Sequence, residues 1–258
     1  MAMDYTISSI DRALRMLEAL SDLPGSGVTE LAERTGCTKS QTFRILYTLE
    51  ARGFVTKDAD RSYRLGFKTM LLGDQGRRQS PLIAAAGPYV NELYQRFEEN
   101  VLVVVRHDLQ SACILQRSSR DQDKIFADHG RTGPLHAGGG SKILLAFAPA
   151  AVQEDVLGGE LPGYTDNTTR EPAKLRSLLD KIRQDGWTIS DGELDHDKRS
   201  VAAPVRDASG VVVAALSVTG SADRMKGEIL GEIREAVVNT AGRLSVALGY
   251  RGVPVMAS

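Results

Sequence analysis

The stretch TKSQTFRILYTLEARGFVTKDADRSYRLGFK, residues 38–68, decides the fold of the N-terminal part of the chain. It opens with a capping box, because the Thr38 hydroxyl can accept a hydrogen bond from the Gln41 backbone while the Gln41 side chain reaches back to the cap. The apolar residues that follow recur at helical spacing and predict one buried face, made of Phe43, Leu46 and Leu49. The stretch therefore begins with an amphipathic helix whose start is well marked.

The other face of this helix carries short polar side chains and Arg near its N-terminus, which is typical of a helix that reads base edges in the major groove. Gly53 ends the helix, and residues 54–57 and 62–65 predict two short strands joined by a hairpin tip at residues 58–61. A reading helix followed by such a hairpin indicates a winged helix. The residues expected to contact DNA are Thr38, Lys39, Ser40, Gln41, Thr42 and Arg44 on the helix, and Arg61 and Arg64 on the wing.

The preceding residues supply the rest of a helix-turn-helix. Residues 10–22 predict a scaffold helix, and its expected apolar stripe consists of Ile10, Ala13, Leu14, Leu17 and Leu20. After a loop rich in Gly and Pro, Thr29 is expected to cap a short helix over residues 30–35, which Gly36 ends. The short helix and the capped helix after it then form the helix-turn-helix pair.

Charge supports DNA binding locally but not globally. The whole chain has 32 Lys plus Arg against 33 Asp plus Glu, a net charge of −1. Residues 39–68 contain seven basic and three acidic residues, so the basic charge is concentrated where DNA would lie. A charge count alone fits an ordinary solvated surface equally well. Together with the cap, the helix pair and the wing, it favours duplex DNA as the partner.

Composition limits the remaining classes. With 258 residues, 42% hydrophobic and 25% charged, the chain is expected to be a soluble protein of two domains. No apolar stretch approaches the length of a membrane span, and the first residues do not resemble a signal peptide, so the protein is expected in the cytoplasm. Cys37 and Cys113 suggest neither a disulfide framework nor a zinc site, and both are expected to be reduced packing residues.

Downstream of the wing, a polar stretch at residues 73–81 is expected to mark a boundary, and residues 81–100 predict a helix that joins the reading head to the rest. The expected organisation is a DNA-binding domain over residues 1–73, a linker helix region over 74–100 and a further domain over 101–258. Hairpin-linked strands with helices between them predict an α+β domain on a mainly antiparallel sheet. The expected strands cover 101–106, 112–117, 187–191, 201–206 and 211–219, and the helices cover 140–147, 149–157, 172–184 and 228–250.

Several segments resemble the IclR family of transcription factors, and together they span nearly the full length. They are RALRMLEAL (12–20), KSQTFRILYTLEARGFV (39–55), YRLG (63–66), PLHAGGGSKILLA (134–146) and VAAPVRDASGVVVAALSVTG (201–220). The resemblance implies a winged helix-turn-helix joined by a helix to a GAF-like effector-binding domain. It also implies homodimers or homotetramers on double-stranded operator DNA, and a small metabolite that changes the DNA-bound state.

An effector pocket can be argued partly from the residues. Gly138, Gly139 and Gly140 expose backbone N–H groups just before a predicted helix, whose N-terminal dipole favours an anion such as a small carboxylate. A bare glycine run fits a flexible turn at least as well. The resemblance implies that this segment, with Ala137, lends backbone to the pocket, and that the pocket is also lined by Ser190, Ser200, Ser217 and Thr219. Ser217 and Thr219 would share one face of their strand.

Two departures from the family pattern point to a different pocket rim. Ser141 stands where the family usually has Gly, and Asp197, Lys198 and Arg199 stand where a Gly commonly precedes the strand. Lys198 or Arg199 could pair with an acidic effector, although a solvated surface role is the simpler interpretation for each.

An enzymatic interpretation finds little support. The four histidines are scattered without an HExxH pair, no G-x-S-x-G elbow is present, and GGGSK lacks the order of a phosphate-binding loop. Residues 191–202 fail the calcium-loop pattern, since His196 stands where Gly is needed and Ala202 where Glu is needed. We therefore expect no catalysis and no cofactor. A zinc site occurs in some relatives of the family, and no residue spacing in this sequence requires one, so no metal ligands are assigned.

The function predicted is a ligand-responsive transcriptional regulator, a repressor relieved by its effector. A ligand-dependent activator is the alternative. A metabolite-sensing or enzymatic module without operator binding is a further alternative.

Overall fold

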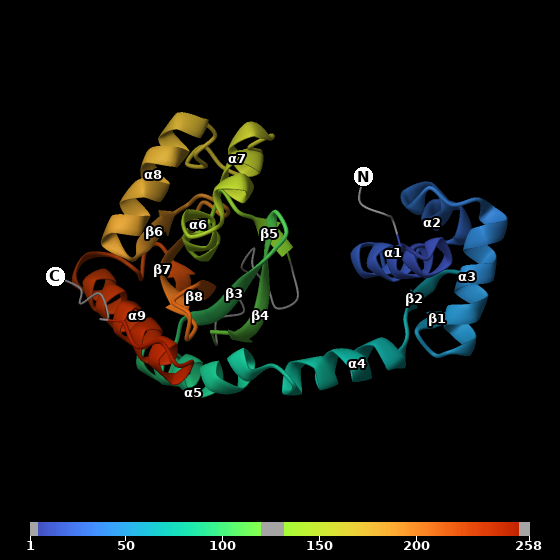
Figure 1. Cartoon of the computed structure of the whole chain (residues 1–258), viewed down its shortest axis with the longest axis horizontal. Helices are drawn as coiled ribbons and strands as arrows, with labels where there is room; N and C mark the ends of the chain where they lie inside the picture. The colour runs from blue at the N-terminus through green and yellow to red at the C-terminus, as the bar shows by residue number, and fades with distance from the viewer. Residues whose placement is uncertain (1–4, 120–131, 253–258) are drawn as a thin grey trace. The chain divides into compact units, whose positions relative to one another are not determined.

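The computed structural model describes residues 5–119 and 132–252. The chain divides into two compact units, residues 1–80 and residues 81–258, and each is described by itself (Figure 1). Within the described residues, no helix is both long and apolar enough to span a bilayer.

The first unit is a winged helix-turn-helix. Its helices are α1 (Ser8–Asp22), α2 (Val28–Thr35), α3 (Lys39–Ala51) and α4 (Phe67–Arg78), and its wing pairs β1 (Val55–Lys57) antiparallel with β2 (Tyr63–Leu65). α3 packs against α1, α2 and β1. The core between them contains Met16, Leu20, Leu31, Leu46 and Tyr63, each at most 2% exposed. The predicted helix pair and wing are confirmed.

Two details of the first helices differ from expectation. Gly27, not Thr29, is the N-cap of α2, and no side chain caps that helix. In α1, Ile10 and Leu14 are each 54% exposed, and Met16 and Ala19 enter the core instead. The expected stripe was wrong at its N-terminal end, because the core-facing side of α1 runs through Met16, Ala19 and Leu20 and not through Ile10 and Leu14.

The polar stretch at 73–81 is not a loop for most of its length. Residues 73–78 continue α4, which buries none of its residues. Residues 73–78 are only glycine, aspartate, glutamine and arginine, so this end of the helix has the composition of a linker. Glycine at positions 73 and 76 costs a helix only about 1 kcal/mol each relative to alanine, which is too little to end it.

The second unit is built on a six-stranded sheet in the order β5-β4-β3-β8-β7-β6, with every neighbouring pair antiparallel. The strands are β3 (Asn100–His107), β4 (Gln110–Arg117), β5 (Thr132–Pro134), β6 (Thr188–Asp191), β7 (Lys198–Arg206) and β8 (Val212–Ser221). The antiparallel α+β fold is confirmed. Only the short strand β5 was not expected.

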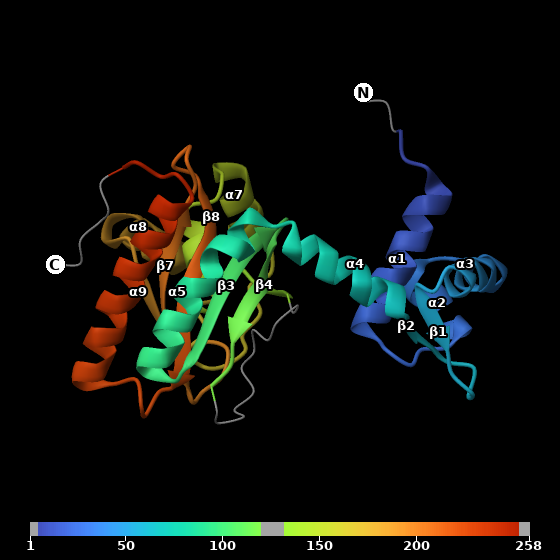
Figure 2. The same cartoon turned by 90° about the horizontal axis from the view of Figure 1, so that it is seen from below.

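Helices cover both faces of this sheet. The helices α5 (Pro81–Phe97) and α9 (Gly227–Ala247) lie on one face, as Figure 2 shows. The helices α6 (Gly139–Ala146), α7 (Ala150–Gly158) and α8 (Pro172–Asp185) form the other layer. Ile229, in the first turn of α9, is 38% exposed, whereas Ile233 and Val237 further along the helix are buried.

The central strands alternate between the two cores. In β3, Val101 and Val103 join the core under α5 and α9, whereas Leu102 and Val104 join the core under α6 and α8. This alternation follows from the period of two in a strand. Leu102 and Val104 therefore point toward the layer that contains α6. Together with residues of β7, β8 and the N-terminus of α6, they line a cavity.

Candidate functional site

The reading helix begins as the sequence predicts. The Gln41 backbone N–H donates to the Thr38 hydroxyl at 3.2 Å, and the Thr38 N–H donates to the Gln41 side-chain oxygen at 3.0 Å. Both groups therefore satisfy backbone donors that an uncapped helix would leave open. The cap fixes where α3 begins and hence which side chains face outward.

The exposed face of α3 differs from the predicted one at two adjacent residues. Lys39, Ser40 and Arg44 are exposed, as expected for residues that contact DNA. Thr42 is completely buried, and its hydroxyl has no hydrogen-bond partner among the described residues, so it cannot contact DNA from this position. Phe43, expected in the core, is 51% exposed.

This exchange has a simple geometric reason. Successive residues of a helix differ by about 100° in direction, so Thr42 and Phe43 face different sides of α3. The core under α1 and α2 takes Leu46 fully and Ile45 and Leu49 in part, and residue 42 lies on that same side, one turn before Leu46. Phe43 was expected in the core because it is apolar. The packing of α3 against α1 and α2 instead buries Thr42.

The wing carries the two expected arginines on its surface. Arg61 is exposed at the hairpin tip with φ of 69°, and Arg64 forms an ion pair with Asp58 at 2.9 Å. Exposed pairs of this kind contribute about 0–1 kcal/mol, so a phosphate can compete for Arg64. Beside them, hydrogen bonds from the Ser62 hydroxyl and backbone lower the pKa of Asp60, which keeps it ionised and the tip ordered.

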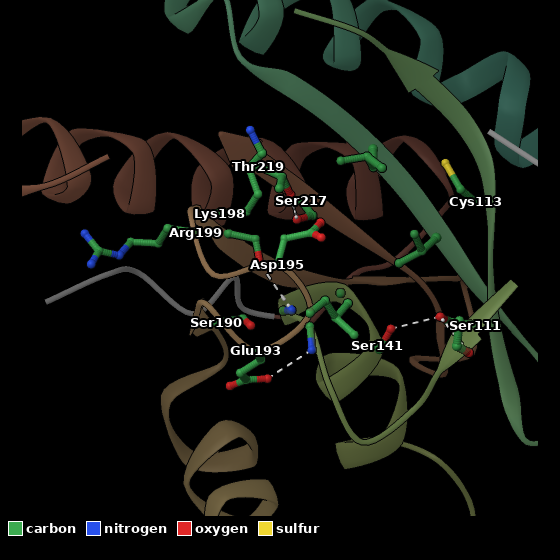
Figure 3. A pocket seen from close by; sticks show the side chains of 18 residues that line it. Ser111, Cys113, Ser141, Ser190, Glu193, Asp195, Lys198, Arg199, Ser217 and Thr219 are labelled. Carbon is green, nitrogen blue, oxygen red and sulfur yellow. Dashed lines mark hydrogen bonds between the residues drawn. The ribbon is translucent and has the colours of Figure 1, made fainter. Parts of the chain in front are cut away.

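The second unit contains a cavity of about 70 Å³ between α6 and the sheet (Figure 3). Seven of the eight predicted effector-binding residues line it, namely Gly138, Gly139, Gly140, Ser190, Ser200, Ser217 and Thr219. Ala137 is fully buried and does not reach the lining. The cavity is also lined by Ser111, Cys113, Ser141, Asp195, Lys198 and Arg199.

The three glycines are required by close packing rather than by flexibility. A Cβ atom on Gly139 would lie 2.7 Å from the Ser200 hydroxyl, and one on Gly140 would lie 2.6 Å from a methyl group of Val104. Gly138 also has φ of 87°, a region that favours glycine. The run therefore lets the N-terminus of α6 approach the strands closely and brings its backbone N–H groups to the cavity.

These N–H groups divide into two pairs. The Gly138 N–H donates to the Glu193 carboxylate at 3.0 Å, and the Gly139 N–H donates to the Ser200 hydroxyl at 3.2 Å. The N–H groups of Gly140 and Ser141 have no acceptor among the described residues. Two open donors at a helix N-terminus, where the helix dipole is positive, form a site suited to an anion.

The sequence interpretation missed a buried ion pair beside this site. Lys142 is 1% exposed and contacts the Glu193 carboxylate, which is 8% exposed and also accepts from Gly138. Burial lowers the pKa of the Lys142 ammonium, and the Glu193 charge opposes that shift. The two residues lie 51 positions apart, so no local pattern could have paired them.

Glu193 also fixes the rim of the cavity. Its backbone carbonyl accepts from the Thr168 hydroxyl at 2.6 Å, and the preceding Gly192 carbonyl accepts from Thr165. Arg199 pairs with Asp191 at 2.6 Å, and 18% of its side chain is exposed, so it is partly buried rather than fully solvated. No group of three or more metal-ligating side chains occurs in the described part of the chain.

A winged helix-turn-helix with cationic side chains on its reading helix and wing, attached to a separate unit that holds a cavity lined by both apolar and polar residues, is the arrangement of a ligand-responsive DNA-binding regulator. Comparison with known proteins agrees. The IclR helix-turn-helix domain matches residues 9–59, and the C-terminal domain of the bacterial transcriptional regulator IclR matches residues 77–246.

The chain is 30% identical over 247 residues to the HTH-type transcriptional regulator BhcR of Paracoccus denitrificans, covering 95% of this chain and 88% of that protein. It is 28% identical over 251 residues to the HTH-type transcriptional regulator KdgR of Escherichia coli, covering 96% and 95%. The crystal structure of an IclR transcriptional regulator from Alicyclobacillus acidocaldarius superposes with a TM-score of 0.85 at 27% identity, covering 95% of this chain and all of that one.

The chain belongs to the IclR family of bacterial transcriptional regulators. This confirms the resemblance seen in the sequence and the interpretation as a DNA-binding regulator rather than an enzyme.

Proposed function

We propose that the protein is a cytoplasmic repressor that binds operator DNA through α3 and the wing, and that a small carboxylate in the second unit's cavity weakens that binding. The observation that supports this proposal most directly is that Gly140 and Ser141 line the cavity and that their backbone N–H groups have no acceptor among the described residues. The DNA-binding unit is separate from this cavity. We favour a repressor over an activator, because an effector releases a repressor from DNA simply by stabilising an arrangement of the protein that does not fit the operator.

The cavity limits the size of the effector. Its volume of about 70 Å³ is less than half of the ~150 Å³ cavity that admits benzene in another protein. Its lining offers the two open N–H groups at one end and the hydroxyls of Ser190, Ser217 and Thr219 elsewhere. A short aliphatic acid therefore fits better than an aromatic one.

The response follows from linkage. A ligand shifts an equilibrium only by its difference in affinity for the two states, and the coupling free energy is the same in both directions. An acid that binds more tightly to the DNA-free arrangement therefore lowers the affinity of the protein for its operator. Operator DNA lowers the affinity of the protein for the acid by the same factor. In an activator, the effector would bind in the same cavity, and the coupling free energy would have the opposite sign, so the effector would strengthen operator binding.

We propose that the protein acts as a symmetric homodimer or a homotetramer, with residues 1–73 as reading head and residues 74–100 as the connection to the effector domain over 101–258. Exposed apolar side chains on α1 and α4 support a second copy as partner, since a soluble chain seldom leaves so many exposed. They are Ile7, Ile10, Leu14, Phe67, Met70, Leu71 and Leu72.

The test uses duplexes enriched by the full-length protein from a random DNA library. Fluorescence anisotropy should give saturable binding that weakens linearly on a log-log plot with rising salt. A thermal-shift screen of short aliphatic acids should find one that raises the melting temperature of the protein, and adding that acid should weaken operator binding. Stronger binding with the acid would establish the activator instead, and the absence of any saturable, salt-dependent binding would refute operator recognition.

A further inference from the structure

The exposed face of α3 is centred on two aromatic side chains. Phe43 is 51% exposed and Tyr47 is 65% exposed, and they lie four residues apart, so they stack along one line of the helix. Lys39 continues that line toward the N-terminus, and Ser40 and Arg44 run beside it. The middle of the surface that this helix presents is therefore apolar and its margins are polar and cationic.

The fold itself gives these rings no role. The core of the first unit contains Leu46 and, in part, Ile45 and Leu49 from this helix, and neither aromatic residue belongs to it. Exposed large apolar groups that cluster on a surface indicate a binding site more often than a structural need.

The surrounding charge selects the partner. The margins of this face carry Lys39 and Arg44, and lysine is depleted in protein interfaces relative to the rest of the surface. Duplex DNA matches both parts of the face, because phosphates line the groove and the 5-methyl group of thymine is an apolar feature on its floor. Phe43 lies in the second turn of α3, within the N-terminal part from which a reading helix contacts bases.

We propose that Phe43, with Tyr47 one turn later, recognises thymine through its 5-methyl group, while Ser40 and Arg44 contact polar base edges or phosphates beside it. The proposal rests on operator binding through α3 and adds the base that this helix selects. It predicts operators with thymine at fixed positions in each half-site.

The test replaces each thymine of an enriched duplex by deoxyuridine, which removes only the 5-methyl group. At one or two positions per half-site, the wild-type full-length protein should bind the deoxyuridine duplex about three- to fourfold more weakly, the effect expected for one buried carbon group. Phe43→Ala should bind both duplexes equally at one of those positions, and Phe43→Leu should keep most of the discrimination. Tyr47→Ala should lose discrimination at a neighbouring position.

Val211→Ala is the matched control, because Val211 is a 57% exposed apolar residue of the other unit and should keep the wild-type ratio. Thermal melts should be unchanged in all variants, since the replaced side chains are exposed. A Phe43→Ala protein that binds DNA yet discriminates as the wild type does at every position would overturn the inference and leave operator binding intact. A wild-type protein without saturable duplex binding would overturn both.

Discussion

At the scale of single residues, positions 42 and 43 carry the main difference between the sequence and the structure. The sequence interpretation placed the polar threonine on the DNA face and the apolar phenylalanine in the core. The structure reverses both, with Thr42 completely buried and Phe43 half exposed. A DNA-reading helix need not be polar on its outer face, because its partner presents methyl groups as well as polar edges.

Thr42→Val should stabilise the protein. The substitution removes a buried hydroxyl that has no partner among the described residues, and an unsatisfied buried polar group costs about 1–3 kcal/mol. Urea denaturation should show a gain of about 1 kcal/mol in the free energy of unfolding, with unchanged DNA affinity. Thr48→Val serves as control, since Thr48 is exposed and should show no comparable gain. A loss of operator affinity without a loss of stability would return Thr42 to the DNA interface.

Arg44→Ala should weaken operator binding without changing the fold. Arg44 is exposed on α3, and a base or phosphate contact by arginine is worth about 1–3 kcal/mol, roughly a tenfold change in the dissociation constant. A gel-shift titration measures the effect, and circular dichroism checks the fold. Arg176→Ala, on an exposed arginine of α8, should leave DNA binding unchanged. Equal affinity of Arg44→Ala and wild type would contradict the placement of α3 in the groove.

At the scale of elements, the first turn of α6 combines three structural features. Glycines allow it to approach β3 and β7, Glu193 and Ser200 accept from the N–H groups of Gly138 and Gly139, and the N–H groups of the cavity-lining residues Gly140 and Ser141 have no acceptor among the described residues. The chain's own carboxylate therefore occupies the position next to the one that an effector carboxylate would take. The Lys142 side chain, buried one turn later, balances that charge.

Glu193→Gln should destabilise the second unit strongly. Breaking a buried ion pair by removing one partner costs about 3–5 kcal/mol, because the other charge stays buried without compensation. Thermal melts should show the loss, and Lys142→Met combined with Glu193→Gln should recover part of it. A melting temperature like that of the wild type would contradict the role of this pair.

The pH dependence of that variant has a definite sign. Burial lowers the pKa of Lys142 below its ordinary value of 10.5, so the folded state binds its proton more weakly than the unfolded state does. Stability should therefore rise as the pH rises from the lowered pKa toward 10.5. The rise should be steeper in Glu193→Gln, which lacks the charge that opposes the shift, and a flat profile would argue against a buried ammonium.

At the scale of the whole molecule, the proposed regulation joins a cavity in one compact unit to a DNA-reading surface in the other. The cavity and the reading helix share no residue, so any influence of one on the other is a coupling free energy between two sites. Variants in the cavity should therefore change the response to the effector and leave DNA binding alone.

Ser217→Val with Thr219→Val tests this separation. Both hydroxyls line the cavity from β8, and valine removes them at nearly constant volume at position 219 and with one added methyl group at position 217, so the effector should lose its polar partners. Calorimetry should show effector binding weakened at least tenfold, while gel shifts without effector match the wild type. Ser221→Ala, on the same strand outside the cavity, is the control. If the double variant binds the effector with wild-type affinity, the hydroxyls of Ser217 and Thr219 do not contribute to effector binding.

The sequence by itself determined what depends on neighbours along the chain. The capping box, the hairpin wing and the strand face shared by Ser217 and Thr219 rest on interactions or periodicity within a few residues, and the structure places each where it was expected. These patterns, with the family resemblance, predicted the class of protein and brought seven cavity residues together in advance.

Only the tertiary structure decided what depends on partners far away in the sequence. It selected Thr42 over Phe43 for the core, paired Lys142 with Glu193 across 51 positions, and left the start of α1 exposed. The physical reason is common to all three, because a side chain's surroundings are set by the elements packed against it. Local periodicity identifies which residues can face a core, and the packing of distant segments decides which of them do.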